Sequence, residues 1–252
     1  MLVERIIPRV VCSFVVLATL SGCITTSSGG IAGPAPDKER LAAQLDLARG
    51  YLEQRDWTRA KAPLERALKI DPNDVEAHVL SAVLFQAQNE KELAERHYRQ
   101  ALRIDPDHAQ ALNNYASFLY SQGRFAEALK PLERLVDDTS YRARAQAFES
   151  LGLSYMQVGE QEKAEAAFRR ALQLNIRLPR SNLELAEIAF ASGDMRMAQS
   201  QFDFYNRIAK PNARSLCLGL KLAHYAGNAD LIARYDLALK NLYPDEAKQC
   251  RT

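Results

Sequence analysis

A period of 34 residues constrains the fold of this chain more than any other feature of its sequence. The segments PLERALKIDPN (63–73) and HYRQALRIDPD (97–107) are 34 residues apart and share the order of their apolar, charged and turn residues. Small residues recur along the chain in two series at nearly the same spacing. The first series is Ala48, Ala82, Ala116, Gly152 and Ala186, and the second is Ala60, Ala94, Ala128, Ala164 and Ala198. An internal period of this length predicts a solenoid of stacked units.

Each unit is predicted to be a pair of helices, because large apolar residues follow the small ones at helical spacing. Those in the first helix are Tyr51, Phe85, Leu119 and Tyr155, and those in the second are Leu64, Tyr98, Leu132, Phe168 and Phe202. Glycines recur where the chain should leave the first helix, at Gly123, Gly159, Gly193 and Gly227. No strand-like alternation occurs from Asp37 onward. This pattern resembles the tetratricopeptide repeat, whose period is also 34 residues.

We therefore expect an all-α protein, a right-handed superhelical solenoid of about six tetratricopeptide helix pairs over residues 37–246, with a C-terminal tail at 247–252. The repeats are assigned at residues 41–74, 75–108, 109–142, 145–178, 179–212 and 213–246, with two extra residues near Tyr141. Pro63 and Pro131 fall inside second helices and are expected to bend them.

The sixth repeat departs most from the pattern. Leu220 and Ile232 stand where small residues are expected, and Asp236 stands where a large apolar residue is expected. Terminal repeats commonly cap a solenoid and carry an atypical sequence. We therefore expect a more loosely packed cap.

The N-terminal segment is predicted to be a lipoprotein signal peptide, residues 1–22. Arg5 and Arg9 precede an apolar run, Val10 to Leu20. This run is too short to span a bilayer comfortably. LSGC (20–23) resembles a bacterial lipobox, which implies diacylglycerol on Cys23 at the mature N-terminus. Ile24, instead of aspartate, follows the cysteine, and by the same resemblance this favours the outer membrane. An ordinary secretory signal with a coincidental cysteine is the alternative.

Residues 23–36 are predicted to be the lipidated N-terminus and a flexible tether. The sequence from Ile24 to Pro36 is rich in Ser, Thr, Gly and Pro and has no charged residue. Such a composition cannot bury enough apolar surface to order itself. A tether of this length reaches about 20 Å root mean square. The solenoid could therefore stand away from the lipid headgroups.

The composition and motifs favour a binding protein over an enzyme. The formal net charge is +2, which gives no strong attraction for nucleic acid. The four histidines, His78, His97, His108 and His224, are scattered without the spacing of metal ligands. The sequence has no phosphate-binding loop, dinucleotide fingerprint or nucleophile elbow. We therefore expect no catalysis, no metal, no cofactor and no small-molecule substrate.

The partner-binding groove is predicted to lie along the first helices. Residues expected to line it in the first three repeats are Leu45, Leu52, Val79, Val83, Asn113 and Tyr120. Such a strip suits an amphipathic or extended partner segment, unless these side chains simply complete the core between helices. Toward the C-terminus the same face is expected to be charged, with Arg180, Glu187, Arg214, Lys221 and His224. A solvated surface would explain those charges equally well.

Two cysteines remain once Cys12 and Cys23 are assigned to the N-terminal segment. Cys217 and Cys250 are 33 residues apart, close to one repeat length. If the chain after Tyr243 forms another helix in register, Cys250 would lie beside the first helix of the sixth repeat. A disulfide would then be possible in an oxidising compartment, with two free thiols as the alternative.

Several segments of the sequence are more specific than the general repeat pattern requires. These are LNNYASFLYSQGRFAEA (112–128), DTSY (138–141), FESLGL (148–153), NARSLCLGLKL (212–222) and LKNLYP (239–244). They resemble, in the same order, the pilotin lipoproteins of type IV pilus biogenesis. The resemblance implies that the partner is the type IV pilus secretin, whose localisation and multimerisation in the outer membrane the lipoprotein promotes. Scaffolding of cell-wall enzymes or of outer-membrane protein assembly is the alternative.

Overall fold

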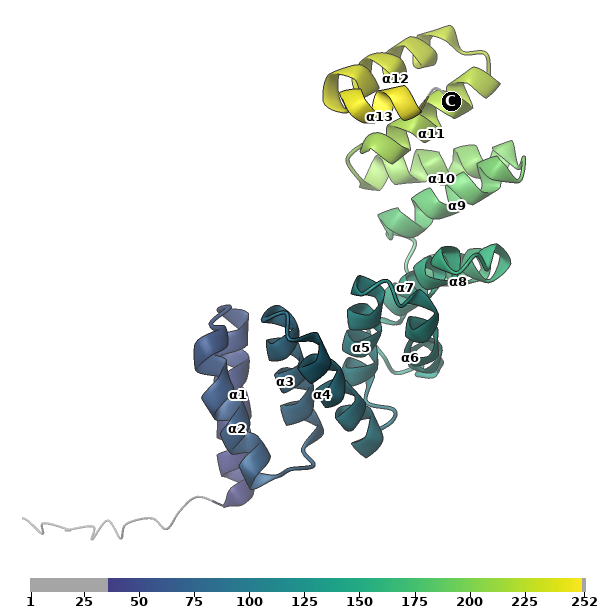
Figure 1. Cartoon of the computed structure of the whole chain (residues 1–252). Coiled ribbons are helices and arrows are strands. Elements are labelled where there is room, and N and C mark those ends of the chain that lie inside the picture. The colour runs from purple at the N-terminus through teal and green to yellow at the C-terminus, as the bar shows by residue number, and fades with distance from the viewer. Residues whose placement is uncertain (1–35, 251–252) are drawn as a thin grey trace, which may run out of the picture. The chain divides into compact units, whose positions relative to one another are not determined.

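The structure is a computed structural model that describes residues 36–250 (Figure 1). The predicted signal peptide, Cys23 and nearly all of the tether lie outside the described residues. Between Pro36 and Cys250 the chain forms thirteen α-helices and no strand. The helices are α1 (Asp37–Glu53), α2 (Trp57–Ile70), α3 (Val75–Ala87), α4 (Lys91–Ile104), α5 (Ala109–Ser121), α6 (Phe125–Asp137), α7 (Arg144–Gln157), α8 (Gln161–Leu174), α9 (Pro179–Ala191), α10 (Met195–Ile208), α11 (Ala213–Tyr225), α12 (Ala229–Leu242) and α13 (Pro244–Gln249).

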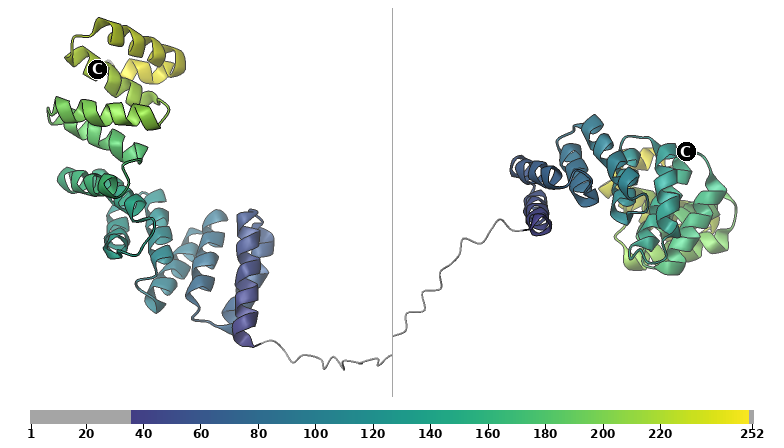
Figure 2. Two further views of the ribbon diagram at one scale, coloured as in Figure 1. Left: turned by 180° about the vertical axis from the view of Figure 1, so that it is seen from behind. Right: turned by 90° about the horizontal axis from the view of Figure 1, so that it is seen from below.

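The helices are organised in consecutive pairs. Each odd-numbered helix from α1 to α11 packs most extensively against the helix that follows it, and the pairs follow one another in chain order (Figure 2). Smaller contacts join neighbouring pairs, such as α2 with α3 and α8 with α9. This arrangement confirms the prediction of an all-α solenoid of tetratricopeptide helix pairs. No helix among residues 36–250 has the length and apolarity needed to cross a bilayer.

The turn within each pair has the same backbone conformation in all six repeats. Gly123, Gly159, Gly193 and Gly227 have positive φ, between 64° and 84°, as expected for glycine at a helix end. The structure adds that Arg55 and Asn89 occupy the equivalent positions of the first two repeats, with φ of 57° and 62°. The turn geometry therefore belongs to the repeat and is imposed even where the residue is not glycine.

The small residues lie where two helices of a pair approach closely. Ala48, Ala82 and Ala186 are fully buried. At Gly152 the approach is closest, since a Cβ atom there would lie 2.7 Å from the ring of Phe168, which is also fully buried. A small residue at this position therefore leaves room for a large side chain from the second helix of the pair.

The sixth repeat keeps this packing but is shifted by one residue. At Gly219 an added Cβ would lie 2.8 Å from the rings of Tyr235 and Phe202. Gly219 and Tyr235 are sixteen residues apart, as are Gly152 and Phe168. The expected pattern placed Leu220 and Asp236 at these two positions and so missed the shift. The sixth pair therefore has the small residue and the aromatic residue that it was expected to lack.

The two prolines lie inside continuous helices. Helix α2 runs through Pro63 and α6 runs through Pro131, and both rings are buried. Each proline lacks the N–H that would bond one turn earlier, yet both helices keep their full length of 14 and 13 residues. The prolines therefore do not end the helices that contain them.

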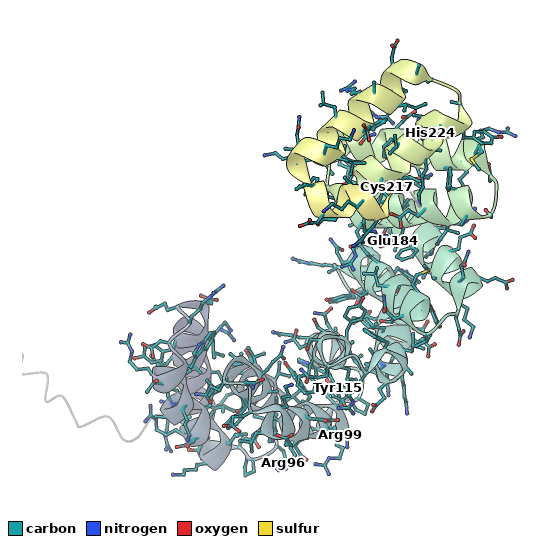
Figure 3. The ribbon with its side chains drawn as sticks, turned by 45° about the horizontal axis from the view of Figure 1, so that its top comes forward. Arg96, Arg99, Tyr115, Glu184, Cys217 and His224 are labelled. Atoms are coloured by element: carbon teal, nitrogen blue, oxygen red, sulfur yellow. A yellow bond between two sulfur atoms is a disulfide. The ribbon has the colours of Figure 1, made fainter. Side chains whose placement is uncertain are left out.

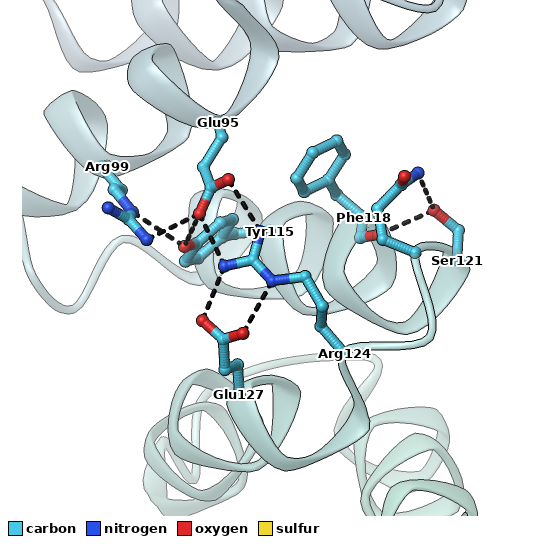
Figure 4. Close-up of polar contacts among 8 residues, drawn as sticks. Glu95, Arg99, Tyr115, Phe118, Ser121, Arg124 and Glu127 are labelled. Atoms are coloured by element: carbon cyan, nitrogen blue, oxygen red, sulfur yellow. Dashed lines mark hydrogen bonds and ion pairs between the residues drawn. The ribbon is translucent and has the colours of Figure 1, made fainter. Parts of the chain in front are cut away.

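A polar network joins the second and third repeats (Figure 4). Glu95 on α4 accepts hydrogen bonds from both terminal nitrogens of Arg124, at 2.7 and 2.9 Å, and from the hydroxyl of Tyr115 at 3.1 Å. Arg99 also pairs with Glu95 at 2.7 Å, and Arg124 pairs with Glu127. The hydrogen bonds from Arg124 hold the pKa of Glu95 below its usual value. The network therefore keeps Glu95 ionised and links α4, α5 and the start of α6.

Two histidines meet between α3 and α4 in the second repeat. The Nδ1 atoms of His78 and His97 are 3.0 Å apart, and Nε2 of His78 is 3.0 Å from the carbonyl oxygen of Pro72. Phe85 stacks on the His97 ring. Because the two Nδ1 atoms face each other, at most one of them can carry a proton. Burial, followed by the charges of His78 and Arg96, lowers the pKa of His97 from 6.5 to about 4.

This histidine pair predicts a stability that falls on acidification. The unfolded chain binds a proton at the usual pKa of histidine and the folded chain binds it only near pH 4, so the unfolded state takes up more protons between these values. The contribution of neutral His97 to the free energy of unfolding is therefore fully present above pH 6.5, and it is lost as the pH falls toward 4. We expect a loss on the order of 1 kcal/mol from this site, allowing for partial solvation.

Urea unfolding of the wild type and His97→Phe at about pH 7 and about pH 5 would measure this loss. The variant is expected to lose less stability than the wild type between the two values. His224→Phe is the matched control, because His224 is exposed on α11. An equal pH dependence of the wild type and His97→Phe would contradict the assignment.

Candidate functional site

The face formed by the first helices contains two hollows. We call the first the central hollow; it has a volume of about 190 Å³ and is formed mainly by α5 and α7, with one residue each from α6 and α9. Its lining residues are Asn113, Ala116, Ser117, Tyr120, Leu132, Ser150, Leu153, Ser154 and Arg180. The lining residues come from three successive repeats, the third to the fifth, so the hollow exists only because the repeats stack.

The central hollow offers hydrogen-bond donors above an apolar floor. The Asn113 side-chain nitrogen has one long contact, 3.4 Å to Asn114. Arg180 is exposed and forms no ion pair among the described residues. Leu132 and Leu153 are buried beneath these polar groups. An amide and a guanidinium placed in this way can hydrogen-bond the carbonyl groups of an extended segment without reading its sequence.

Of the six residues predicted to line a groove, some line the central hollow and others are buried in the core. Asn113 and Tyr120 line the central hollow, whereas Leu45 and Val79 are core residues, 6% and 1% exposed. Val79 packs with Ala101 and Ala111, because α5 of the next repeat covers it.

Leu45 likewise packs in the cluster formed by the first pair and α3. The prediction that Leu45 and Val79 face a groove is therefore wrong, since stacking of the next repeat closes these positions. Leu52 and Val83 are half-buried, and Leu52 packs against the same first cluster.

The second hollow lies at the C-terminal end and we call it the terminal hollow. It has a volume of about 380 Å³ and is formed by α9, α11 and α13. Its charged and polar lining residues are Glu187, Arg214, Lys221, Glu246 and Gln249, and its apolar lining includes Phe190, Leu218 and the two cysteines. Three residues of the expected charged surface, Glu187, Arg214 and Lys221, therefore meet here. Arg180 belongs to the central hollow, and His224 is exposed on α11 (Figure 3).

Arg214 organises the charges of the terminal hollow. It donates to both carboxylate oxygens of Glu184, at 2.8 and 3.0 Å, and also pairs with Glu187. The Glu184 side chain is 7% exposed, whereas Arg214 is half-exposed. The hydrogen bond to Glu184 raises the pKa of Arg214 above its already high value. This bidentate pair satisfies a buried carboxylate and joins α11 to α9.

A disulfide joins Cys217 on α11 to Cys250, with a Cα–Cα distance of 5.6 Å. A helix does follow Tyr243: α13 begins at Pro244 and its end brings Cys250 against α11. The two cysteines, with Glu246 and Gln249, form one wall of the terminal hollow. The C-terminal residues therefore belong to the folded unit up to Cys250.

Two features of the site were not found by sequence reasoning. Burial of Glu184 was missed because a glutamate in a first helix is normally solvated. The terminal hollow was also missed: the sequence allowed a helix after Tyr243, but the repeat pattern ends at residue 246 and α13 is too short to show which face it would present. No group of three or more potential metal ligands occurs among residues 36–250.

Comparison with known proteins agrees with this architecture. The tetratricopeptide repeat family matches residues 41–84, 80–147 and 145–175. The type IV pilus assembly protein PilF of Pseudomonas aeruginosa is 38% identical over 234 residues, which cover 92% of each chain.

Two solved structures are similar throughout most of the solenoid. A structure of Pseudomonas aeruginosa PilF superimposes with a TM-score of 0.78 at 38% identity, covering 85% of this chain and 98% of that one. The crystal structure of PilW, described as a widely conserved type IV pilus biogenesis factor, gives a TM-score of 0.68 at 30% identity and covers 84% and 98%. On the similarity in sequence and the shared repeat architecture, this chain belongs to the PilF family of tetratricopeptide-repeat proteins of type IV pilus assembly.

Proposed function

We propose that this protein is an outer-membrane lipoprotein that binds the type IV pilus secretin in the periplasm and promotes its localisation and multimerisation. The observation that carries the proposal is the similarity to PilF, at 38% identity over 92% of both chains. Pilus biogenesis and twitching motility would then depend on this protein. It acts as a scaffold and not as a catalyst.

A lipid on Cys23 would place the solenoid at the membrane where the secretin assembles. Acyl chains contribute about 0.8 kcal/mol for each buried methylene, so two or more chains hold a protein durably. The uncharged tether up to Pro36 then lets the repeats search the adjacent periplasm. Confinement of this kind raises the effective concentration of a captured subunit near the membrane.

The two hollows on the first-helix face support a scaffold that holds part of an unassembled subunit. The central hollow presents Asn113 and Arg180 with free hydrogen-bonding capacity, and the terminal hollow presents charged residues beside an apolar wall. The disulfide between Cys217 and Cys250 fits an oxidising compartment such as the periplasm. These features support protein recognition outside the cytoplasm.

The proposal is tested by the amount and membrane location of secretin multimers in cells. Cells lacking the protein are compared with cells carrying the wild type, Cys23→Ala or Arg180→Glu. Multimers are expected to disappear or to shift to the inner membrane without the protein. Cys23→Ala should shift their location, and Arg180→Glu should reduce their amount while leaving the location of the lipoprotein unchanged.

Normal multimers in the outer membrane of cells lacking the protein would overturn the secretin assignment. Co-purification of a cell-wall hydrolase or of a barrel-assembly factor would then assign the scaffold to one of those systems. Immunoblots of the lipoprotein in each strain distinguish loss of function from loss of the protein itself.

A further inference from the structure

A groove rich in cations lies away from the first-helix hollows, between the second helices of repeats two and three. Five basic side chains line it: Arg96, Arg99 and Arg103 from α4, and Lys130 and Arg134 from α6. Its volume is about 540 Å³, and no acidic residue is among those that line it. We call this surface the basic groove. Figure 3 labels Arg96 and Arg99 on α4 and Tyr115 on the adjacent α5.

The floor of the basic groove is apolar. Leu112 is 4% exposed and Pro131 is buried, and both lie under the cations together with half-buried Leu102 and Tyr115. Tyr115 is held in place because its hydroxyl donates to Glu95 and accepts from Arg99. A surface of this kind can take an apolar side chain on its floor and anionic groups on its rim.

The positive charge of the groove is only partly neutralised by the protein itself. Arg134 pairs with Asp107, and Arg99 pairs with Glu95, which Arg124 also engages. Arg96 and Lys130 are exposed and have no ion pair among the described residues. A chain with a formal net charge of only +2 therefore concentrates uncompensated cations at one apolar groove.

From this combination we propose that the basic groove binds an acidic segment of a partner protein, with an aromatic or large aliphatic side chain flanked by Asp or Glu. The flanking carboxylates would pair with the arginines and Lys130, and the apolar side chain would contact Leu112, Tyr115 and Pro131. A small free anion would leave the apolar floor uncovered. The predicted tether of this chain would not supply carboxylates for the groove either, because residues 24–36 contain no acidic residue. The proposal does not depend on the identity of the partner of the first-helix face.

The test uses three fluorescein-labelled peptides that differ only in the feature under study. Asp-Glu-Phe-Asp-Glu has both the charge and the anchor, Asn-Gln-Phe-Asn-Gln lacks the charge, and Asp-Glu-Ala-Asp-Glu lacks the anchor. Fluorescence anisotropy with the folded protein is expected to show that only the first peptide binds well. Each of the other two should bind at least about tenfold more weakly, and added salt should weaken the first.

The double variant Arg96→Glu/Lys130→Glu tests whether the first peptide binds at the basic groove. It leaves the Glu95 network intact, because neither residue belongs to that network. Its matched control is Lys69→Glu/Arg196→Glu, which changes two exposed cations elsewhere by the same charge. The groove variant is expected to lose at least about tenfold in affinity for the first peptide and the control less than about twofold. Circular dichroism checks that both are folded.

Three results would overturn the proposal. Equal losses in the two double variants would show a general effect of net charge. Equal binding of the three peptides would show no recognition of charge or anchor. Binding to vesicles of phosphatidylglycerol and phosphatidylethanolamine that is lost in the groove variant, without binding of the acidic peptide, would assign the groove to a lipid surface.

Discussion

Replacing both Cys217 and Cys250 by alanine is expected to destabilise the C-terminal end of the solenoid by about 3 to 4 kcal/mol, because the disulfide closes a loop with a sequence separation of 33. The helix that it secures, α13, has only six residues and packs on α11 and α12. In a repeat protein a loss of this kind stays local, since each pair contacts only its neighbours. Hydrogen exchange should therefore accelerate by about a hundredfold or more in α12 and α13 and remain unchanged in α3 and α4.

Reduction of the wild-type disulfide is the control for this experiment. It removes the covalent bond but keeps both side chains, so it separates the cross-link from the packing of Cys250, which is nearly buried. The reduced wild type and the double variant should show the same loss of protection. Unchanged exchange in α12 and α13 of both would mean that packing alone holds this end. Opening of α13 would also remove one wall of the terminal hollow.

Replacing Gly152 by valine is expected to destabilise the fourth repeat by about 2 to 3 kcal/mol. The new Cβ would lie 2.7 Å from a ring atom of Phe168, and that ring is fully buried in the largest core cluster. Neither the ring nor the helix backbone can move without opening contacts with neighbouring pairs. Urea unfolding, with hydrogen exchange to locate the loss in α7 and α8, measures the effect.

Gly50→Val is the matched control, because Gly50 is also inside a first helix. A Cβ at Gly50 meets no atom within 4 Å, so this substitution should be neutral or stabilise by a few tenths of a kcal/mol through higher helix propensity. A loss of stability in Gly152→Val without one in Gly50→Val would show that the effect at Gly152 comes from crowding and not from the loss of glycine. A small or favourable effect at Gly152 would contradict the packing described.

The repeat period is sufficient to predict how the helices pair. Small residues 34 residues apart require helices that approach at the same point in each unit, and the large residues that follow them have nowhere else to pack. Gly123, Gly159, Gly193 and Gly227 likewise predict the turn, because the positive φ at this repeat position favours glycine. Such features depend on neighbours a few residues away and can be read from sequence.

The sixth repeat shows what the period cannot predict. Gly219 and Tyr235 form its close approach, although the strict period points to Leu220 and Asp236. A shift of one residue changes which side of the helix faces its partner, and the close approach of Gly219 to Tyr235 and to Phe202 of the preceding repeat reveals it. Periodicity finds the helices, but their rotation about their own axes is set by packing.

The candidate sites depend still more on contacts between repeats. The sequence singled out Asn113 and Tyr120, which line the central hollow, but could not distinguish them from Leu45 and Val79, which neighbouring helices cover. The basic groove was not foreseen, because its cations come from two repeats and form a surface only when stacking brings α4, α5 and α6 around one groove. Sequence by itself thus determined the all-helical repeat and its turns, since these follow from local spacing. Tertiary structure alone decided which apolar side chains remain accessible and which charges meet, because burial and charge neighbours depend on how successive pairs stack.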